Sequence, residues 1–500
     1  MKRIISLFLI ILPLTVNSQV SRLGEDVLYK AELTGAVSNG SHMPVWFTNN
    51  RYGLGNRTDN YAFLRGSIQR DVESDQARNW RIGYGLDAVA SVGMDNHVIL
   101  QQLYADVQWK IIRLSIGQKE RPLEFKNQYL SSGAMTSGIN ARPLPQLRLE
   151  LPDFWTIPRT KGWLAMKARI AYGAYTDNGW QRHFNAGEQK QIYTANSFYH
   201  TKALLLRIGN TEIFPATLSG GLEMCNQFGG KAWNVRRLID SEPVYYNEKL
   251  PSGISAFWHA LIPGGNDSND GDFANKAGNH LGSWHMRFDG EWQRWKLGLY
   301  AEHFFEDESQ MFLLYGWKDM LYGAEVGFPK NPIIQTLLYE HIGTRDQSGP
   351  IYHDATETLP VQISGLDEYY NNHIYGAWQH AGFSMGSPLL LSPLYNNNHA
   401  ISVLHNRITA HHLGIMGQPI SELSYRLLYS HEKSWGTYVH PLIDPQKANY
   451  LLAELSYMPQ WLPGFTIKVS YGHNDGKLLG GSNGGMLTFS YSGLINRTSK

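Results

Sequence analysis

The sequence predicts an all-β protein: a transmembrane antiparallel β-barrel of about 18 strands, with long irregular loops or plug segments obstructing the lumen. Three observations support this prediction. Many segments alternate between apolar and polar residues, as strands do when one face meets lipid and the other a polar lumen. The chain begins with the pattern of an export signal. No later segment offers the ~20 consecutive apolar residues that a membrane-spanning helix needs.

The clearest hairpin covers residues 281–305. If Gln293 and Arg294 form a two-residue loop, Trp292 and Trp295 are directly opposed on one apolar face. Indole rings favour the boundary between hydrocarbon and water, so this hairpin favours a lipid-facing barrel over a soluble all-β protein. The apolar face of its first half carries Trp284, Met286, Phe288, Gly290 and Trp292.

The N-terminus has the layout of a secretory signal peptide. Lys2 and Arg3 precede an apolar run at residues 4–14, and small polar residues follow it. We therefore expect residues 1–19 to be a signal peptide and residues 20–500 to form one barrel domain in the outer membrane of a Gram-negative bacterium. An uncleaved anchor is the alternative. No cysteine lies near the expected cleavage point, so a lipoprotein anchor is not indicated.

The composition narrows the classes of function. Cys225 is the single cysteine, which rules out an intramolecular disulfide and argues against a cysteine-based metal site. Loss of Lys2 and Arg3 with the signal peptide would change the net charge from +1 to −1, which gives no sign of a nucleic-acid partner. A mean hydropathy of −0.34 suits a barrel in which only alternate residues touch lipid.

About 17 segments have the alternation of strands and are separated by polar or glycine-bearing turns. Because bacterial single-chain barrels have an even number of strands, the expected number is about 18. The segments are residues 61–71, 80–92, 98–109, 111–118, 162–175, 200–209, 217–227, 281–292, 295–305, 321–328, 334–343, 376–386, 401–413, 421–432, 449–459, 465–473 and 485–493.

Four long stretches interrupt this pattern. Residues 19–61 are irregular, and we expect Pro44 to Asn50 to be an ordered loop or plug. Residues 119–161 contain five prolines, which argue against long helices and central strands. A long irregular segment in a barrel is often folded into the lumen, so this one is expected to narrow the pore. Residues 228–279 and 344–375 are expected to be long surface or luminal loops.

Motifs for catalysis or metal binding are weak. Residues 480–484 match G-x-S-x-G, but glycines surround the serine where a nucleophile needs a strand and a helix, so a flexible hairpin loop is expected. Residues 266–272 resemble the start of a calcium loop, yet Ala277 stands where a bidentate glutamate is needed. His411 and His412 are neighbours on a strand and point to opposite faces. The sequence predicts no enzyme activity, cofactor or metal.

The long loops are rich in aromatic rings and amides, which are the groups that bind sugars. Rings stack on the C–H faces of sugars, and amides and carboxylates pair with hydroxyl groups. For Trp378 alone, a place in an interfacial girdle is an equally good interpretation. The candidate polysaccharide-binding residues are Trp233, Tyr245, Tyr246, Trp258, Tyr369, Tyr370, Asn371, Asn372 and Trp378.

Three blocks of the sequence resemble the Wzi family of outer-membrane capsule assembly proteins, in the form found in Bacteroides-type bacteria. The resemblance spans nearly the whole mature chain. It implies an 18-stranded barrel with an obstructed pore and a lectin-like role that fastens exported capsular polysaccharide to the cell. It does not imply an enzyme, and no loop motif allows the family's binding residues to be carried over. The blocks are residues 44–53 (PVWFTNNRYG), 138–147 (GINARPLPQL), and 369–375 (YYNNHIY) with 386–389 (GSPL).

Two other functions stay open. A channel for sugars or other small solutes would use the charged inner faces as a conduit, with Arg287, Asp289, Lys296 and Glu302 as examples. A lipid hydrolase would carry serine and histidine on the outer wall, but the sequence singles out no such pair. The predicted partners are capsular polysaccharide and outer-membrane lipid, with no nucleic acid, and the barrel is expected to be a monomer.

Overall fold

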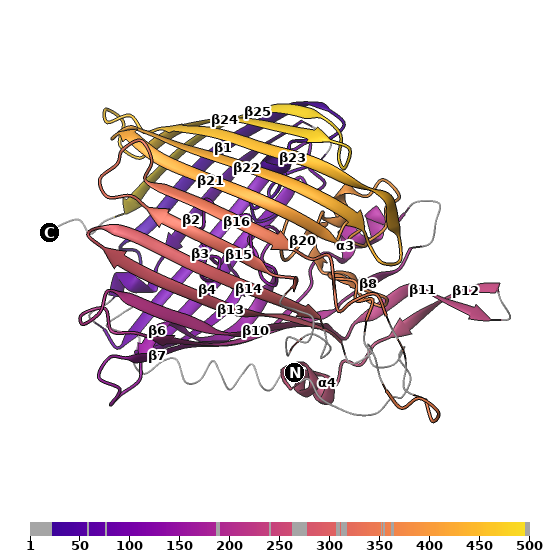
Figure 1. Ribbon diagram of the computed structural model, residues 1–500. Coiled ribbons are helices and arrows are strands. Elements are labelled where there is room, and N and C mark those ends of the chain that lie inside the picture. The colour runs from indigo at the N-terminus through magenta and orange to yellow at the C-terminus, as the bar shows by residue number, and fades with distance from the viewer. Residues whose placement is uncertain are drawn as a thin grey trace.

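The computed structural model describes residues 23–57, 60–75, 78–186, 191–239, 242–262, 278–306, 311, 318–351, 353, 356–361 and 365–495. The predicted signal peptide and the acidic run at residues 266–272 lie outside these ranges. Within them, 18 antiparallel strands form a closed barrel (Figure 1). The barrel closes because β1 (Val27–Gly40) pairs with both β2 (Tyr61–Arg70) and β25 (Ser482–Ile495), which leaves no open edge.

Each barrel strand pairs with the next barrel strand along the chain, so the topology is up-and-down. The other barrel strands are β3 (Trp80–Val92), β4 (Val98–Trp109), β5 (Ile112–Gln118), β6 (Pro145–Thr156), β7 (Leu164–Ala174), β9 (Phe198–Ile208), β10 (Ala216–Phe228), β13 (Asn279–Trp292), β14 (Trp295–Glu306), β15 (Leu321–Gly327), β16 (Thr336–Gly343), β21 (Ile408–Ile420), β22 (Leu423–Gly436), β23 (Pro441–Tyr457) and β24 (Phe465–Gly476).

Short elements lie in the connections between these strands. None of the helices in the described ranges is long and apolar enough to cross a membrane. The short elements are α2 (Val45–Thr48), η2 (Val72–Asp75), α3 (Asn178–Phe184), β8 (Tyr193–Ala195), β11 (Lys231–Ile239), β12 (Glu242–Lys249), α4 (Ile254–Leu261), β17 (Asn371–Asn372), β18 (Gly376–Ala377), β19 (Gln379–His380), β20 (Phe383–Ser384) and η5 (Pro393–Tyr395).

The hairpin β13–β14 confirms the predicted register. Trp292 pairs with Trp295, and the two loop residues between them have positive φ angles of 49° and 71°, as a two-residue hairpin loop requires. Met286 is 60% exposed on the outer wall, whereas its neighbour His285 is 2% exposed and faces the lumen. The alternation of the sequence is therefore an alternation between lipid and lumen.

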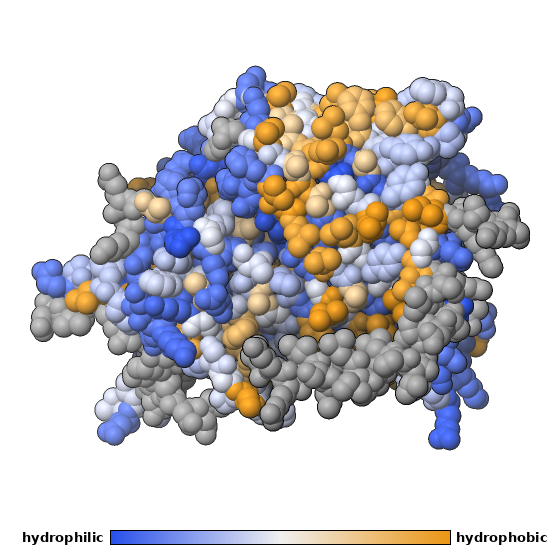
Figure 2. All heavy atoms as spheres, turned by 180° about the vertical axis from the view of Figure 1, so that it is seen from behind, coloured by the Kyte–Doolittle hydropathy of each residue, from blue (hydrophilic) through white to orange (hydrophobic). Residues whose placement is uncertain are grey.

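The outer wall has the surface of a membrane protein. Hydrophobic side chains gather on the wall of the barrel, and hydrophilic ones lie toward its ends (Figure 2). Exposed tryptophans mark one edge of this apolar belt, where an indole ring can face both lipid and water. These are Trp80, Trp109, Trp163, Trp292, Trp295 and Trp461.

The two ends of the barrel differ in the length of their connections. One end has short turns, such as residues 110–111 and 293–294, and holds both ends of the described chain. The other end carries the long connections, including residues 41–60, 175–197, 229–278 and 344–407. Outer-membrane barrels have short periplasmic turns and long extracellular loops, so we assign the short-turn end to the periplasm.

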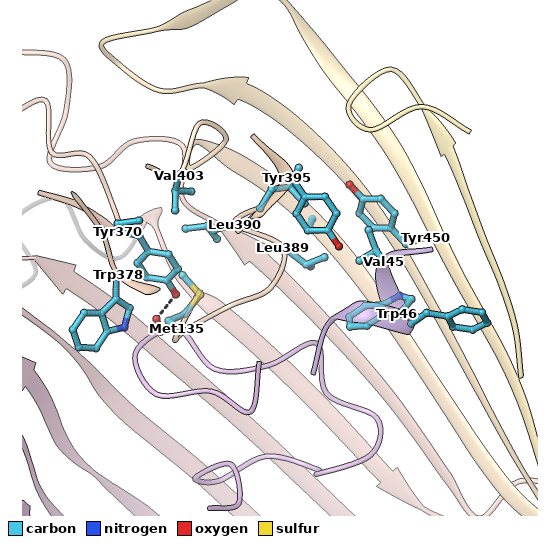
Figure 3. Packing of buried hydrophobic residues seen from close by; sticks show 14 of the residues in the cluster. Val45, Trp46, Met135, Tyr370, Trp378, Leu389, Leu390, Tyr395, Val403 and Tyr450 are labelled. Carbon is cyan, nitrogen blue, oxygen red and sulfur yellow. Dashed lines mark hydrogen bonds between the residues drawn. The ribbon is translucent and has the colours of Figure 1, made fainter. Parts of the chain in front are cut away.

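The lumen is filled by three segments that we call the plug: residues 41–57, 119–144 and 365–407. Their apolar side chains form one buried cluster that includes Trp46, Met135, Leu389 and Tyr370 (Figure 3). The wall makes room for this cluster, because a Cβ at Gly472 would lie only 2.7 Å from the Cβ of Pro44. The prediction that residues 44–50 are an ordered loop or plug is confirmed. The prediction that residues 119–161 narrow the pore is confirmed for residues 119–144, whereas residues 145–156 form a strand of the wall.

Four features of the fold differ from the prediction. β1 lies in a stretch that was expected to be irregular, and β6 lies within the proline-rich one. Residues 376–386 were expected to cross the membrane, but they form only the short strands β18, β19 and β20 inside the plug. Residues 228–279 are not a plain loop, because they contain the hairpin β11–β12 and the helix α4.

Candidate functional site

Two buried carboxylates on the barrel wall hold the plug in place. Glu302 accepts hydrogen bonds from Lys126 Nζ and from the backbone N–H of Met135 at 2.9 Å. Glu340 accepts hydrogen bonds from Ser131 Oγ at 2.7 Å and from both the N–H and the hydroxyl of Ser132. It also accepts one at 2.6 Å from the hydroxyl of a tyrosine in the barrel strand β14. These carboxylates are 1% and 0% exposed, so the wall and the plug share one buried polar network.

Two of the charged residues that would line the conduit of a channel also contact the plug. Arg287 donates to the carbonyl oxygen of Phe125 at 2.6 Å, and Glu302 is bound to Lys126 as described above. Their charges are therefore engaged with the chain's own plug.

Three of the predicted sugar-binding residues are core residues of the plug. Tyr369, Tyr370 and Trp378 are each 0% exposed. The hydroxyl of Tyr370 donates to the carbonyl of Met135, and Trp378 Nε1 donates to the carbonyl of Thr136 at 3.0 Å. Because their rings are packed on all sides, they offer no surface to a polysaccharide, and Trp378 does not belong to an interfacial girdle either. This corrects the expectation for these three residues.

The two amides beside them also serve the fold. Asn371 donates to the carbonyl of Val403 at 2.9 Å and accepts from its N–H at 2.7 Å. Asn372 Oδ1 accepts from the N–H groups of Ile374 and Tyr375 at 2.9 and 3.0 Å. Both side chains are half-buried. Both polar groups of Asn371 and the side-chain oxygen of Asn372 therefore hold the plug backbone.

The hairpin β11–β12 carries three of the predicted residues, and they remain accessible. It projects beyond the barrel wall at the long-loop end (Figure 1). Trp233 stacks nearly parallel to Tyr193 of β8, with ring centroids 6.0 Å apart and an interplanar angle of 4°, and Lys231 Nζ lies 3.8 Å from the centroid of the Trp233 ring. Tyr245 is 40% exposed, and Tyr246 is half-buried. The structure thus brings Trp233, Tyr245 and Tyr246 together on one projecting element.

Trp258 lies elsewhere, on the helix α4. Phe257 of this helix packs against Phe198 and Phe228 at centroid distances of 5.2 and 5.0 Å, and its carbonyl accepts a hydrogen bond from Tyr172. Phe198 and Phe228 occupy the same alternate positions of β9 and β10 as side chains that are exposed on the outer wall. The helix α4 therefore covers the outer wall. Trp258 is 58% exposed on the side of α4 that faces away from the barrel.

The helix α4 shields polar groups on the lipid-facing wall. Lys202 Nζ donates to the carbonyl of Leu261 and to that of Ala260 at 3.2 Å, so the C-terminal carbonyls of the helix receive a positive charge. His200 and His280 lie on the same outer face, where His200 is buried and His280 is half-buried. Ile254, Trp258 and Ile262 point outward and extend the apolar belt over these polar residues.

A cavity of about 380 Å³ lies in the lumen between the plug and the strands β5, β6, β7 and β10. It extends from Asp71, in the short turn between β2 and β3, to Gly138 and Met385 in the plug. Charged side chains dominate its lining in the described part of the chain. The basic ones are Arg113, Lys119, Arg121, Arg142, Arg148, Lys167 and Arg169, and the acidic ones are Asp71, Glu120, Glu124, Glu150 and Glu223.

The charged groups that line the cavity shift the pKa values of their neighbours. Burial by itself would raise the pKa of Glu124, but Arg169 and Lys167, both 3.0 Å away, hold it below its ordinary value. Burial, together with nearby Arg148, lowers the pKa of the Arg121 guanidinium to about 10. Sequence analysis missed this site, since its members come from strands and plug segments far apart in the chain.

The remaining candidates from the sequence are the pair His411 and His412 and the single cysteine Cys225. Within the described ranges, no group of three or more His, Cys, Asp or Glu side chains could hold a metal ion. As predicted, His411 and His412 point to opposite faces. His412 faces the lumen, where it contacts the carbonyl of Leu130 at 2.7 Å, and His411 lies outside, 2.8 Å from the Tyr339 hydroxyl. Cys225 is a buried free thiol on β10.

A closed barrel with an apolar belt, aromatic edges and a plugged lumen is an outer-membrane protein of Gram-negative type. No model of a known protein family matches the chain, and no curated protein matches it either. The resemblance to the Wzi family therefore stays a prediction at the level of sequence.

Solved structures share the fold. The Wzi protein of Escherichia coli, described as a carbohydrate-binding β-barrel involved in group 1 capsule assembly, aligns with a TM-score of 0.56 and 13% identity, over 95% of this chain and 86% of that one. OccK3 of Pseudomonas aeruginosa aligns with a TM-score of 0.45 and 12% identity, over 96% of this chain and all of that one. The first likeness supports the barrel fold, and the second is too distant to argue from.

Proposed function

We propose that this protein is an outer-membrane anchor that binds an exported capsular polysaccharide at the cell surface and helps to attach it there. The observation that carries the proposal is an aromatic hairpin that projects from a barrel whose own lumen is plugged. A plugged barrel is poorly suited to transport, whereas a rigid barrel presents an extracellular element in a fixed position. The description of the similar E. coli Wzi structure as carbohydrate-binding agrees with this role.

The proposed contact surface is the hairpin β11–β12. Tyr245 offers an exposed ring on which the C–H face of a sugar can stack. The parallel pair of Trp233 in this hairpin and Tyr193 in β8 forms a second flat aromatic surface, and Lys231 adds a positive charge to it. The function involves binding only, with no bond made or broken.

Binding of purified protein to the capsular polysaccharide of its source strain tests this proposal. Tyr245→Ala and Trp233→Ala should each weaken binding about fivefold, because stacking on one ring contributes on the order of 1 kcal/mol. The double substitution removes both rings and should weaken binding about 25-fold. Trp461→Ala is the matched control, since this ring is 77% exposed at the opposite end of the barrel. Equal binding by all variants would refute the assignment of the hairpin.

A channel for sugars or small solutes is the second candidate, and the charged luminal cavity favours it. Conductance in planar bilayers separates the two functions. If the plug stays in place, the protein should be nearly silent. A steady ion current through the unmodified barrel would support the channel and contradict an occluded anchor.

A further inference from the structure

The luminal cavity is distinct from the projecting hairpin. Its lining joins the periplasmic turn at Asp71 to the plug, so it lies on the periplasmic side of the occlusion. Its volume of about 380 Å³ is at the lower end of the range for small-molecule sites. A cavity of this size suits a ligand of one or two sugar rings rather than a polymer.

The cavity carries positive charge that its own carboxylates do not neutralise. Arg148 forms a close ion pair with Glu150 at 2.5 Å, whereas Arg121 lies farther from the same carboxylate, at 3.5 Å. Arg142 forms no ion pair within 4 Å in the described part of the chain. Burial of a guanidinium group without a close carboxylate is costly, so Arg142, and Arg121 with its longer contact to a shared carboxylate, can each pair with an added anion.

Unused hydrogen-bonding capacity points to the same two side chains. The Nε atoms of Arg121 and Arg142 are buried and donate to no acceptor among the described residues. Gln146, which also lines the cavity, has an Oε1 atom that accepts no hydrogen bond in that set. Buried polar atoms are normally paired, so such atoms around one cavity indicate a polar ligand.

We propose that this cavity is a binding site for a small sugar acid. The carboxylate of the ligand pairs with Arg121 and Arg142, whose planar guanidinium groups suit a two-oxygen anion. The hydroxyl groups pair with Gln146 and with the carboxylates of Glu124 and Glu150, which accept hydrogen bonds. Those same carboxylates disfavour a ligand with two negative charges, so a monoanionic carboxylate fits better than a phosphate dianion.

Calorimetric titration of the purified full-length barrel with galacturonate tests the site. We expect saturable binding that weakens as salt rises, with no binding of galactose and weaker binding of galactose 6-phosphate. Arg121→Gln and Arg142→Gln should each weaken galacturonate binding at least tenfold. Arg159→Gln is the control, because this exposed arginine lies at the same end of the barrel but outside the cavity.

Several results would overturn the proposal. They are the absence of saturable galacturonate binding, unchanged binding in both arginine variants, and tighter binding of galactose 6-phosphate, which would assign the site to phosphate. Retained strand content in circular dichroism checks the fold, and Arg142→Gln decides the matter if Arg121→Gln does not fold. Trp233→Ala should leave galacturonate binding intact, so this test stands apart from the hairpin test.

Discussion

The plug should loosen when Glu340 loses its charge. Glu340→Gln preserves the size of the side chain, but it replaces one acceptor oxygen with a donor. In the native structure the two oxygens of Glu340 accept from Ser131, from the N–H and hydroxyl of Ser132, and from Tyr300. The amide cannot accept all of these bonds, so about two buried donors on the plug and the wall lose their acceptor.

The size of the effect follows from these bonds. Hydrogen bonds to a charged group contribute about 1.5–3 kcal/mol each, so the loss of two weakens the docking of the plug by about 3–6 kcal/mol. Since about 1.4 kcal/mol changes an equilibrium tenfold, the undocked fraction should rise by two to four orders of magnitude. Barrel strands are held by the backbone ladder and should stay folded.

Planar-bilayer conductance measures this change. The native protein should be nearly silent, and Glu340→Gln should show frequent openings. Glu212→Gln is the control, because Glu212 is exposed in the short turn between β9 and β10. Silent behaviour of Glu340→Gln in a protein that is correctly inserted would refute the argument that this carboxylate holds the plug.

Three further outcomes are expected. Tyr370→Phe should lower the free energy of unfolding of the plug by about 1–3 kcal/mol, because the hydroxyl bonds Met135 and Ser387; unchanged protease resistance of the plug would contradict this. Burial lowers the pKa of His405 to about 4, below its unfolded value of about 6.5, so the folded plug favours the neutral ring. The free energy of unfolding of the plug should therefore fall by up to about 3 kcal/mol as the pH falls from about 6.5 to 4. Proteolysis across that range should show the loss in the native protein and not in His405→Asn; equal pH dependence of the two would argue against it. A spin label at Trp258→Cys should be more accessible to oxygen than to a water-soluble nickel complex, since α4 lies on the outer wall, and the reverse order would place this helix in water.

The barrel wall was largely predictable because its residues face two different solvents. One face of each strand meets lipid and the other meets a polar lumen, so apolar and polar residues alternate along the strand. Where the two faces of a strand differ little in polarity, the strand was not predicted. The outer face of β1 includes Ala31 and Gly35, which blur the apolar pattern. In β6, Pro145 is the first residue, and Pro152 lies where the pairing with β7 is irregular, so neither proline breaks the ladder.

The interior was harder to predict, because residues of the plug are buried on all sides. Tyr369, Tyr370 and Trp378 have the composition of a sugar-binding loop, yet they pack in a core that forms only when three distant segments meet. The same holds for the cavity, where Arg121 and Glu150 come together only after closure of the barrel. Periodicity reports the environment along one strand and not contacts between segments.

Capsule retention tests the central claim most directly. In cells that lack this protein, total polysaccharide should be normal, but most of it should move from the cell surface into the medium. Cells that carry Tyr245→Ala together with Trp233→Ala should show the same release, with a normal amount of barrel in the membrane. If the polymer stays on the cell in both strains, the protein is not its anchor.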